Sequence, residues 1–181
     1  MLYVFIAITA ILIIFGIVMY YITKYNQIQF YITKIETSES IIDETLRNRY
    51  DLLSKMIKII KSKVKKTKDY FKDFNNLTEE NISNFDFDRK ITEMIGLCET
   101  VVNDHTVLES NKDIKVLFAE LKNNEEKLVA TKNYYNKETT SLNTIIRKFP
   151  TNLICIIHRV KVRPYFDGKN MTDDIIDDFK I

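Results

Sequence analysis

The residues of this chain that could do chemistry are few and widely spaced. Its two cysteines are Cys98 and Cys155, and its two histidines are His105 and His158. Cys155 and His158 are three residues apart, so on a helix they would share a face and could form a thiolate–imidazole pair. An ordinary thiol beside an ordinary histidine is the commoner meaning of so short a pattern. We therefore expect two free thiols, with one disulfide as the alternative.

Metal and nucleotide chemistry are not indicated by the remaining motifs. A di-iron bundle needs Glu-x-x-His pairs, but the positions three residues before the histidines hold Val102 and Cys155. The sequence has no Cys-x-x-Cys pair, and its 3 glycines form no phosphate loop. The acidic pairs at 173–174 and 177–178 lack the glycine and the spacing of a calcium loop. The sequence thus predicts no enzyme, with no catalytic residue, metal ligand or cofactor.

The amino-acid composition indicates which kind of secondary structure holds these side chains in place. Hydrophobic residues make up 45% of the 181 residues, and only 3 Gly and 2 Pro interrupt them. Such a chain favours long uninterrupted helices over a turn-rich β structure, so we predict an all-α fold. The charge is balanced, with 27 basic and 25 acidic residues, and does not indicate a nucleic-acid partner.

Residues 1–23 carry no charged side chain. About 20 helical residues cover the ~30 Å hydrocarbon core of a bilayer, so we predict a single transmembrane helix. Tyr20, Tyr21 and Tyr25 would lie at the headgroup interface. A cleaved signal peptide is the alternative, but signal peptides typically have a basic N-terminal region, a shorter apolar run and small residues at the cleavage site.

The charges that follow this helix predict its orientation. Lys24, Lys34, Arg47 and Arg49 come after the apolar run, whereas no Lys or Arg precedes it. The positive-inside rule then places the C-terminal body in the cytoplasm of a single-pass membrane protein.

Beyond the membrane helix, apolar residues recur at helical spacing. We expect the first helix to continue from the membrane helix without a break and to be followed by a loop over 73–85. A second helix is expected over 87–108. A connector over 109–111 follows, in which Ser110 or Asn111 caps the next helix. The first stripe consists of Ile28, Ile32, Ile35, Ile42, Leu46, Leu53, Ile57, Ile60, Val64 and Phe71. The second consists of Ile91, Met94, Ile95, Cys98 and Val102.

The third helix has a seven-residue repeat. Its apolar row consists of Ile114, Leu121, Leu128, Tyr135, Leu142 and Phe149. The row four residues later is polar in its middle, at Glu125, Lys132 and Thr139. Such a repeat predicts helices packed nearly parallel or antiparallel, as in a coiled coil. Glu125 and Lys132 either find a partner on this seam or extend from its edge into solvent.

A lysine run lies at the C-terminal end of the first predicted helix. Residues 55–68 hold seven lysines and no acid. An anionic surface, lipid or nucleic acid, is one interpretation, and a solvated helix face is the other. If the helix is straight, Lys61 lies roughly 55 Å beyond Lys24, well outside the ~8–10 Å screening length. The residues of this interaction surface are Lys58, Lys61, Lys63, Lys65, Lys66 and Lys68.

Short motifs follow one another in order over two blocks, about residues 1–72 and 105–167. The first block carries Tyr25-Asn26, Ile42-Asp43, Leu46 and Arg49-Tyr50-Asp51-Leu52. The second carries Leu108, Glu125, Tyr135-Asn136, Asn143, Arg147, Phe149-Pro150, Asn152-Leu153-Ile154 and Pro164-Tyr165-Phe166. Together these motifs resemble the LemA family of membrane-anchored bacterial proteins. Glu39 stands where the family usually has Trp.

The resemblance implies an N-terminal membrane helix followed by an antiparallel bundle, in a family with no established enzymatic activity. We expect a membrane anchor at 1–23, a LemA-like bundle at 24–160 and an extended acidic tail at 161–181. Within the bundle, Arg49 and Glu125 are predicted to pair, and Asn136 and Asn143 to bond a neighbouring helix or loop. Thr151 is predicted to cap a short helix over 152–160.

These expectations favour a membrane-anchored scaffold or adaptor that presents a bundle surface to an unidentified protein partner. The alternative is a module that binds anionic lipid or nucleic acid through the 55–68 lysines. Self-association into a homo-oligomer is left open.

Overall fold

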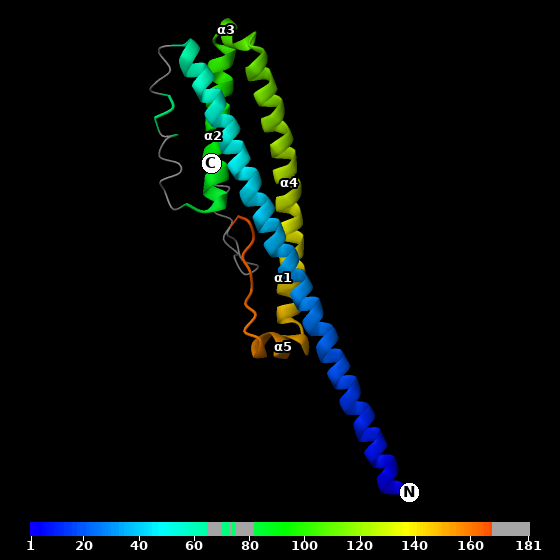
Figure 1. Cartoon of the computed structure of the whole chain (residues 1–181). Helices are drawn as coiled ribbons and strands as arrows, with labels where there is room; N and C mark the ends of the chain where they lie inside the picture. Colours follow the sequence, from blue (N-terminus) through cyan, green and yellow to red (C-terminus); the bar gives the residue numbers. More distant parts are fainter. Residues whose placement is uncertain (65–69, 73, 75–81, 168–181) are drawn as a thin grey trace. The chain divides into compact units, whose positions relative to one another are not determined.

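A computed structural model describes residues 1–64, 70–72, 74 and 82–167 of the chain. Over these residues every regular element is a helix (Figure 1). The helices are α1 (Leu2–Lys63), α2 (Asn84–Asn103), α3 (Thr106–Glu109), α4 (Lys112–Arg147) and α5 (Thr151–Ile157). The all-α prediction, a long apolar N-terminal helix with further helices after it, is confirmed.

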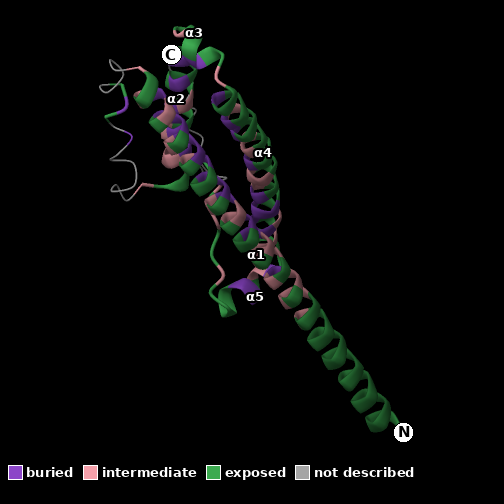
Figure 2. Cartoon of the chain, turned by 45° about the horizontal axis from the view of Figure 1, so that its top comes forward, coloured by how far each residue is buried: buried purple, intermediate pink, exposed green. Residues whose placement is uncertain are grey.

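Helix α1 runs unbroken from the apolar N-terminal stretch into the charged part of the sequence, as predicted. It contains no proline, and its one glycine, Gly16, does not interrupt it. Residues 1–20 are all exposed, as the green N-terminal part of α1 shows in Figure 2. Among the described residues, α1 is the one helix with a stretch long and apolar enough to cross a membrane.

The chain divides into two compact units. Unit 1 consists of 1–37 and 135–181, and unit 2 of 38–134. The long helices α1 and α4 each contribute residues to both units. Residues 168–181, which include most of the predicted acidic tail, lie outside the described residues.

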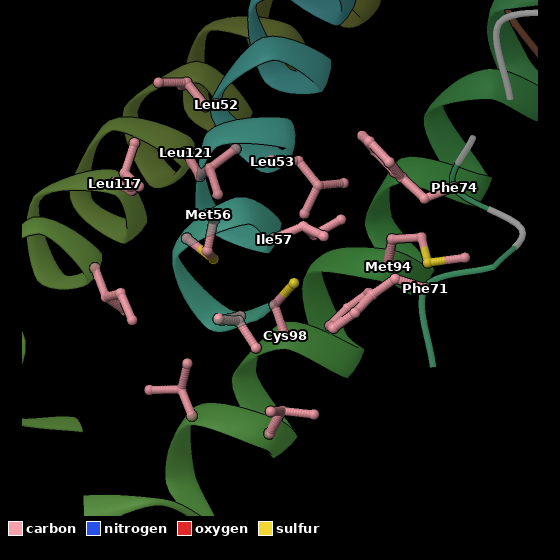
Figure 3. Close-up of a cluster of buried hydrophobic side chains, with 14 of the residues drawn as sticks. Leu52, Leu53, Met56, Ile57, Phe71, Phe74, Met94, Cys98, Leu117 and Leu121 are labelled. Atoms are coloured by element: carbon pink, nitrogen blue, oxygen red, sulfur yellow. The ribbon is translucent and has the colours of Figure 1, made fainter. Parts of the chain in front are cut away.

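Unit 2 contains a hydrophobic core to which α1, α2 and α4 all contribute (Figure 3). Within it α1 and α2 run in the same direction, and α4 runs antiparallel to both (Figure 1). Leu53 and Met56 of α1, Cys98 of α2 and Leu121 of α4 are at most 3% exposed. Full burial of one large aliphatic side chain stabilises a fold by about 1.5–3 kcal/mol. This cluster accounts for the first predicted stripe from Leu53 onward and for the second stripe.

The seven-residue row of α4 is buried along the helix. Ile114, Leu121, Leu128, Tyr135 and Leu142 are at most 5% exposed. Phe149, the last residue predicted for this row, is instead 73% exposed. The reason is that α4 ends at Arg147, so Phe149 no longer follows the helical repeat.

The second helix ends earlier than predicted. Helix α2 stops at Asn103, and His105 has an extended backbone, with φ −131° and ψ 103°. Leu108 is therefore buried from the separate four-residue helix α3. The prediction of one helix over 87–108 was wrong because the apolar spacing continues across this break.

The helix ends show which predicted caps form. Asn111 caps α4, because its Oδ1 accepts from the backbone N–H groups of Asp113 and Ile114 at 2.9 and 3.3 Å. Thr151 is the first residue of α5 rather than its cap, and the helix ends at Ile157 instead of Val160. Of the predicted loop over 73–85, residues 73 and 75–81 lie outside the described residues, and Ser83 caps α2 by accepting from the N–H of Asp86.

Candidate functional site

A charged cluster links the three long helices of unit 2. Arg49 of α1 is 2% exposed and forms ion pairs with Asp88 of α2 and with Glu125 of α4. The second pair joins Arg49 Nη2 to Glu125 Oε2 at 2.5 Å. Arg49 Nη2 also donates to Thr92 Oγ1 at 3.3 Å. A planar guanidinium can meet several acceptors at once, and a buried charge needs such partners.

The cluster continues to a fourth charged residue. The second carboxylate oxygen of Asp88 accepts from the ammonium group of Lys132 on α4. Glu125, Arg49, Asp88 and Lys132 thus form a row of alternating charges with no net charge. Lys132 is half-buried and does not extend freely into solvent, because its charged end is held against Asp88.

A groove with a volume of about 770 Å³ opens beside this cluster, between α2, α3 and α4. Arg49, Thr92 and Glu125 line it together with Gly96, where an added Cβ would meet no atom within 4 Å. The apolar part of the lining comes from Ile95, Val102, Ile114, Phe118, Ala119 and Leu121. The charged part also includes Glu99, Glu109, Lys115 and Lys122. An apolar groove with a few fixed polar groups is the usual form of a binding site.

The two predicted asparagines of α4 bind main chain in unit 1. Asn143, fully buried, donates from Nδ2 to the carbonyl of Arg163 at 2.8 Å and accepts the Arg163 N–H at 2.9 Å. Asn136 Oδ1 accepts the N–H of Phe166 at 2.9 Å. Tyr135 donates its hydroxyl to the carbonyl of Pro164 at 3.1 Å. The partner of both asparagines is therefore the extended segment 163–166, not a neighbouring helix.

The lysine run is only partly described. Lys58 and Lys63 are exposed, and Lys61 is half-buried with its Nζ 5.8 Å from the centre of the Phe71 ring. Lys65, Lys66 and Lys68 lie outside the described residues.

Both cysteines are free and buried. Burial, with a smaller contribution from the charge of Glu99, raises the pKa of Cys98 from 9.0 to about 12. Burial also raises the pKa of Cys155. The thiolate is the nucleophilic form, so both thiols are poor nucleophiles near neutral pH. His158, three residues from Cys155, is bonded through Nε2 to the Tyr21 hydroxyl at 2.6 Å.

No group of three or more His, Cys, Asp or Glu residues that could hold a metal ion is found over the described ranges.

Sequence reasoning missed Asp88, the acid that joins Arg49 to Lys132. A signal for it was present, because Asp88, Ile91, Ile95, Cys98 and Val102 follow one another at steps of three and four residues. An acid that starts an apolar helical stripe faces the core and needs a buried cation.

Comparison with known proteins found a match to one family model. Searches of curated proteins and of solved structures found no match to the chain. The model described as the LemA family matches residues 38–176, which is more than half of the sequence. The match includes all of unit 2, with Arg49, Asp88 and Glu125, as well as the α4 asparagines and the segment that they bind. The chain therefore belongs to the LemA family.

Proposed function

We propose that the protein is a membrane-anchored adaptor that binds a helical segment of a partner protein in the groove of unit 2. Residues 1–23, which include the start of α1, are the single-span anchor, and the body lies in the cytoplasm. The proposal assigns no reaction to the chain.

The observation that carries this proposal is the groove between α2, α3 and α4. Its walls are mainly apolar, and Gly96 leaves space that a larger residue would fill. The Arg49–Glu125 pair gives one part of it fixed charges. An amphipathic helix placed in such a groove buries its apolar face and leaves its polar face in water.

The anchor rests on the exposed apolar stretch of α1. Among its large apolar side chains, Phe5, Ile11 and Phe15 are 70%, 65% and 63% exposed, which in water would be costly over so long a run. The cytoplasmic orientation rests on the basic residues that follow it, beginning with Lys24.

Site-specific photo-crosslinking in cells would test the groove. A photoreactive amino acid at Lys115, which lines the groove, should give a discrete adduct whose crosslinked peptide maps to an amphipathic helix of the partner. The same residue at the neighbouring Val116, which is 56% exposed and outside the lining, serves as the matched control.

The variant Gly96→Trp should remove the Lys115 adduct because the indole fills the groove. Leu97→Trp, on an exposed neighbouring position outside the lining, should leave the adduct intact. Equal adducts from Lys115 and Val116, or an adduct that survives Gly96→Trp, would show that the groove is not the docking surface. Circular dichroism of both Trp variants establishes that the helices remain folded.

A further inference from the structure

Helix α5 of unit 1 presents large apolar side chains to its surroundings. Leu153, Ile156 and Ile157 are 51%, 69% and 67% exposed, and Phe149 just before the helix is 73% exposed. The opposite side of the same helix is buried through Ile154 and Cys155. Four large exposed apolar side chains within nine residues are unusual for a surface in contact with water.

Helix α5 lies against the last part of the apolar stretch of α1. The Tyr20 hydroxyl is 3.5 Å from Thr151 Oγ1, and the Tyr21 hydroxyl is 2.6 Å from His158 Nε2. Both ends of α5 are thus tied to the tyrosines that belong at the headgroup level of a bilayer.

A cleft of about 540 Å³ separates the two helices on one side. It is lined by Ile13, Gly16 and Ile17 of α1 and by Leu153, Ile154 and Ile157 of α5, with Tyr20, Tyr21 and Pro150 completing it. Ile13 is ten residues before Thr23, which is about 15 Å along a helix. The cleft therefore reaches to the depth of lipid acyl chains if α1 spans a bilayer.

Basic residues flank α5 on both sides. Arg147 and Lys148 precede it, Arg159 and Lys161 follow it, and all four are exposed. No Asp or Glu occurs between Glu138 and Asp167. Exposed apolar side chains bordered by exposed Lys and Arg are typical of a helix that lies in the interface of an anionic membrane.

We infer that α5 is a second membrane contact, seated in the same leaflet from which α1 emerges. Its exposed Leu153, Ile156 and Ile157 enter the acyl region, and the basic flanks bind anionic lipid headgroups. An acyl chain occupies the cleft between α1 and α5. This inference rests on the proposed anchor, and it is independent of the proposed partner groove in unit 2.

The absence of Trp from the sequence allows a direct test of depth. The full-length protein is reconstituted in phosphatidylcholine–phosphatidylglycerol vesicles in which one lipid carries brominated acyl chains that quench Trp fluorescence. Ile156→Trp reports on α5, Ile11→Trp reports on the anchor, and Val107→Trp reports on an exposed site of unit 2. We expect brominated lipid to lower the emission of the first two variants at least about twofold and to leave the third unchanged.

The three reporters separate failure of this inference from failure of the anchor. Quenching of Ile11→Trp without quenching of Ile156→Trp would leave the anchor intact and overturn the membrane contact of α5. Absence of quenching in both would overturn the anchor and the inference together. Quenching of Val107→Trp to the same degree as Ile156→Trp would mean that the whole protein adsorbs to the vesicle without a specific contact. That result would also overturn the inferred membrane contact of α5.

The inferred binding of anionic headgroups is tested by comparing vesicles in which either the phosphatidylglycerol or the phosphatidylcholine carries the brominated acyl chains. At equal mole fractions, brominated phosphatidylglycerol should quench Ile156→Trp about 1.5-fold more than brominated phosphatidylcholine, because the basic flanks enrich the anionic lipid. Adding Arg147→Gln, Lys148→Gln and Lys161→Gln, which removes three of the four flanking basic residues, should bring that ratio close to one. The control substitutions Arg89→Gln, Lys112→Gln and Lys127→Gln, all on exposed basic residues of unit 2 outside the groove lining, should leave it unchanged. A ratio that survives the first set would show that these flanks do not bind the headgroups.

Discussion

The side-chain amide of Asn143 bonds both main-chain groups of Arg163, donating at 2.8 Å and accepting at 2.9 Å. One carboxamide thus supplies the pair of hydrogen bonds that a neighbouring β-strand would otherwise supply. Asn143 is fully buried, so few waters could replace it if it were lost. The extended segment after α5 is held on α4 by this pairing.

Replacing Asn143 by Ala should release that segment. The change leaves the Arg163 N–H and C=O without their partner, a loss of about 2 kcal/mol in the free energy of unfolding. Limited trypsin digestion should then cut after the exposed Lys161 several-fold faster than in the wild type. Asn133→Ala, on an exposed position of the same helix, should leave the cutting rate unchanged. Equal rates in all three proteins would mean that Asn143 does not hold the segment.

The Arg49–Glu125 pair should appear as a coupling energy. Arg49→Ala is expected to cost about 2–3 kcal/mol because it removes one of the two cations, Arg49 and Lys132, that pair with buried Asp88. Glu125→Ala should cost about 1 kcal/mol, since the Glu125 side chain is 42% exposed. A double-mutant cycle by urea unfolding should give about 1 kcal/mol of coupling between them.

The exposed pair Asp43–Arg47, 3.0 Å apart on α1, is the control for this cycle. Its side chains are 46% and 76% exposed, so its coupling should stay below about 0.5 kcal/mol. If the effects of Arg49→Ala and Glu125→Ala simply add, the pair carries no interaction energy of its own.

The buried thiol of Cys98 should make stability depend on alkaline pH. Burial raises its pKa from 9.0 to about 12. The unfolded chain loses this proton near pH 9 while the folded chain keeps it, so ionisation favours unfolding as pH rises. The contribution of the Cys98 thiol to the free energy of unfolding is complete below pH 9, and it should fall by roughly 1.4 kcal/mol per pH unit between pH 9 and pH 12.

Chemical unfolding of wild type and Cys98→Ala at intervals from pH 8 to pH 10.5 would measure this. The variant is less stable at pH 8 because it loses packing, but it lacks the ionisation. The difference between the two proteins should therefore shrink above pH 9. Two curves that stay parallel over this range would contradict the raised pKa.

Membrane orientation can be read from a single cysteine at exposed Lys63. In a Cys98→Ala, Cys155→Ala background, Lys63→Cys should resist a membrane-impermeant maleimide in intact cells and react after lysis, since the proposal places the body in the cytoplasm. Leu2→Cys, at the N-terminal end of the predicted span, should react in intact cells. The reverse labelling pattern would place the body outside the cytoplasm.

The sequence predicted the helices wherever burial follows a regular spacing. Most of the predicted stripe on α1 and the seven-residue row of α4 are buried, because each residue's neighbours on the helix face are also apolar. Ile32 of the stripe is half-buried, and its last two residues, Val64 and Phe71, lie beyond the end of α1. Spacing could not locate the end of α2, since Leu108 keeps the apolar repeat after the chain has turned at His105. Such a break depends on backbone angles, which the hydrophobic pattern does not record.

The candidate site was less predictable than the fold. Arg49 and Glu125 could be paired because each is a charged residue on or beside an apolar row. The bonds of Asn136 and Asn143 to segment 163–166 could not be foreseen, because main-chain groups are present at every residue and leave no pattern in a sequence. The groove was not predicted either, because its lining comes from separate helices and the sequence does not give the distances between them.

The hydrogen bonds from α4 to segment 163–166 determine which amino-acid substitutions that segment can accept during evolution. They hold main-chain groups, namely the N–H and C=O of Arg163, the C=O of Pro164 and the N–H of Phe166. Nearly every amino acid offers the same groups, so these bonds place no requirement on the side chains at 163 and 166. The exception is proline, which has no N–H and would remove the hydrogen bond to Asn143 at position 163 or the one to Asn136 at position 166.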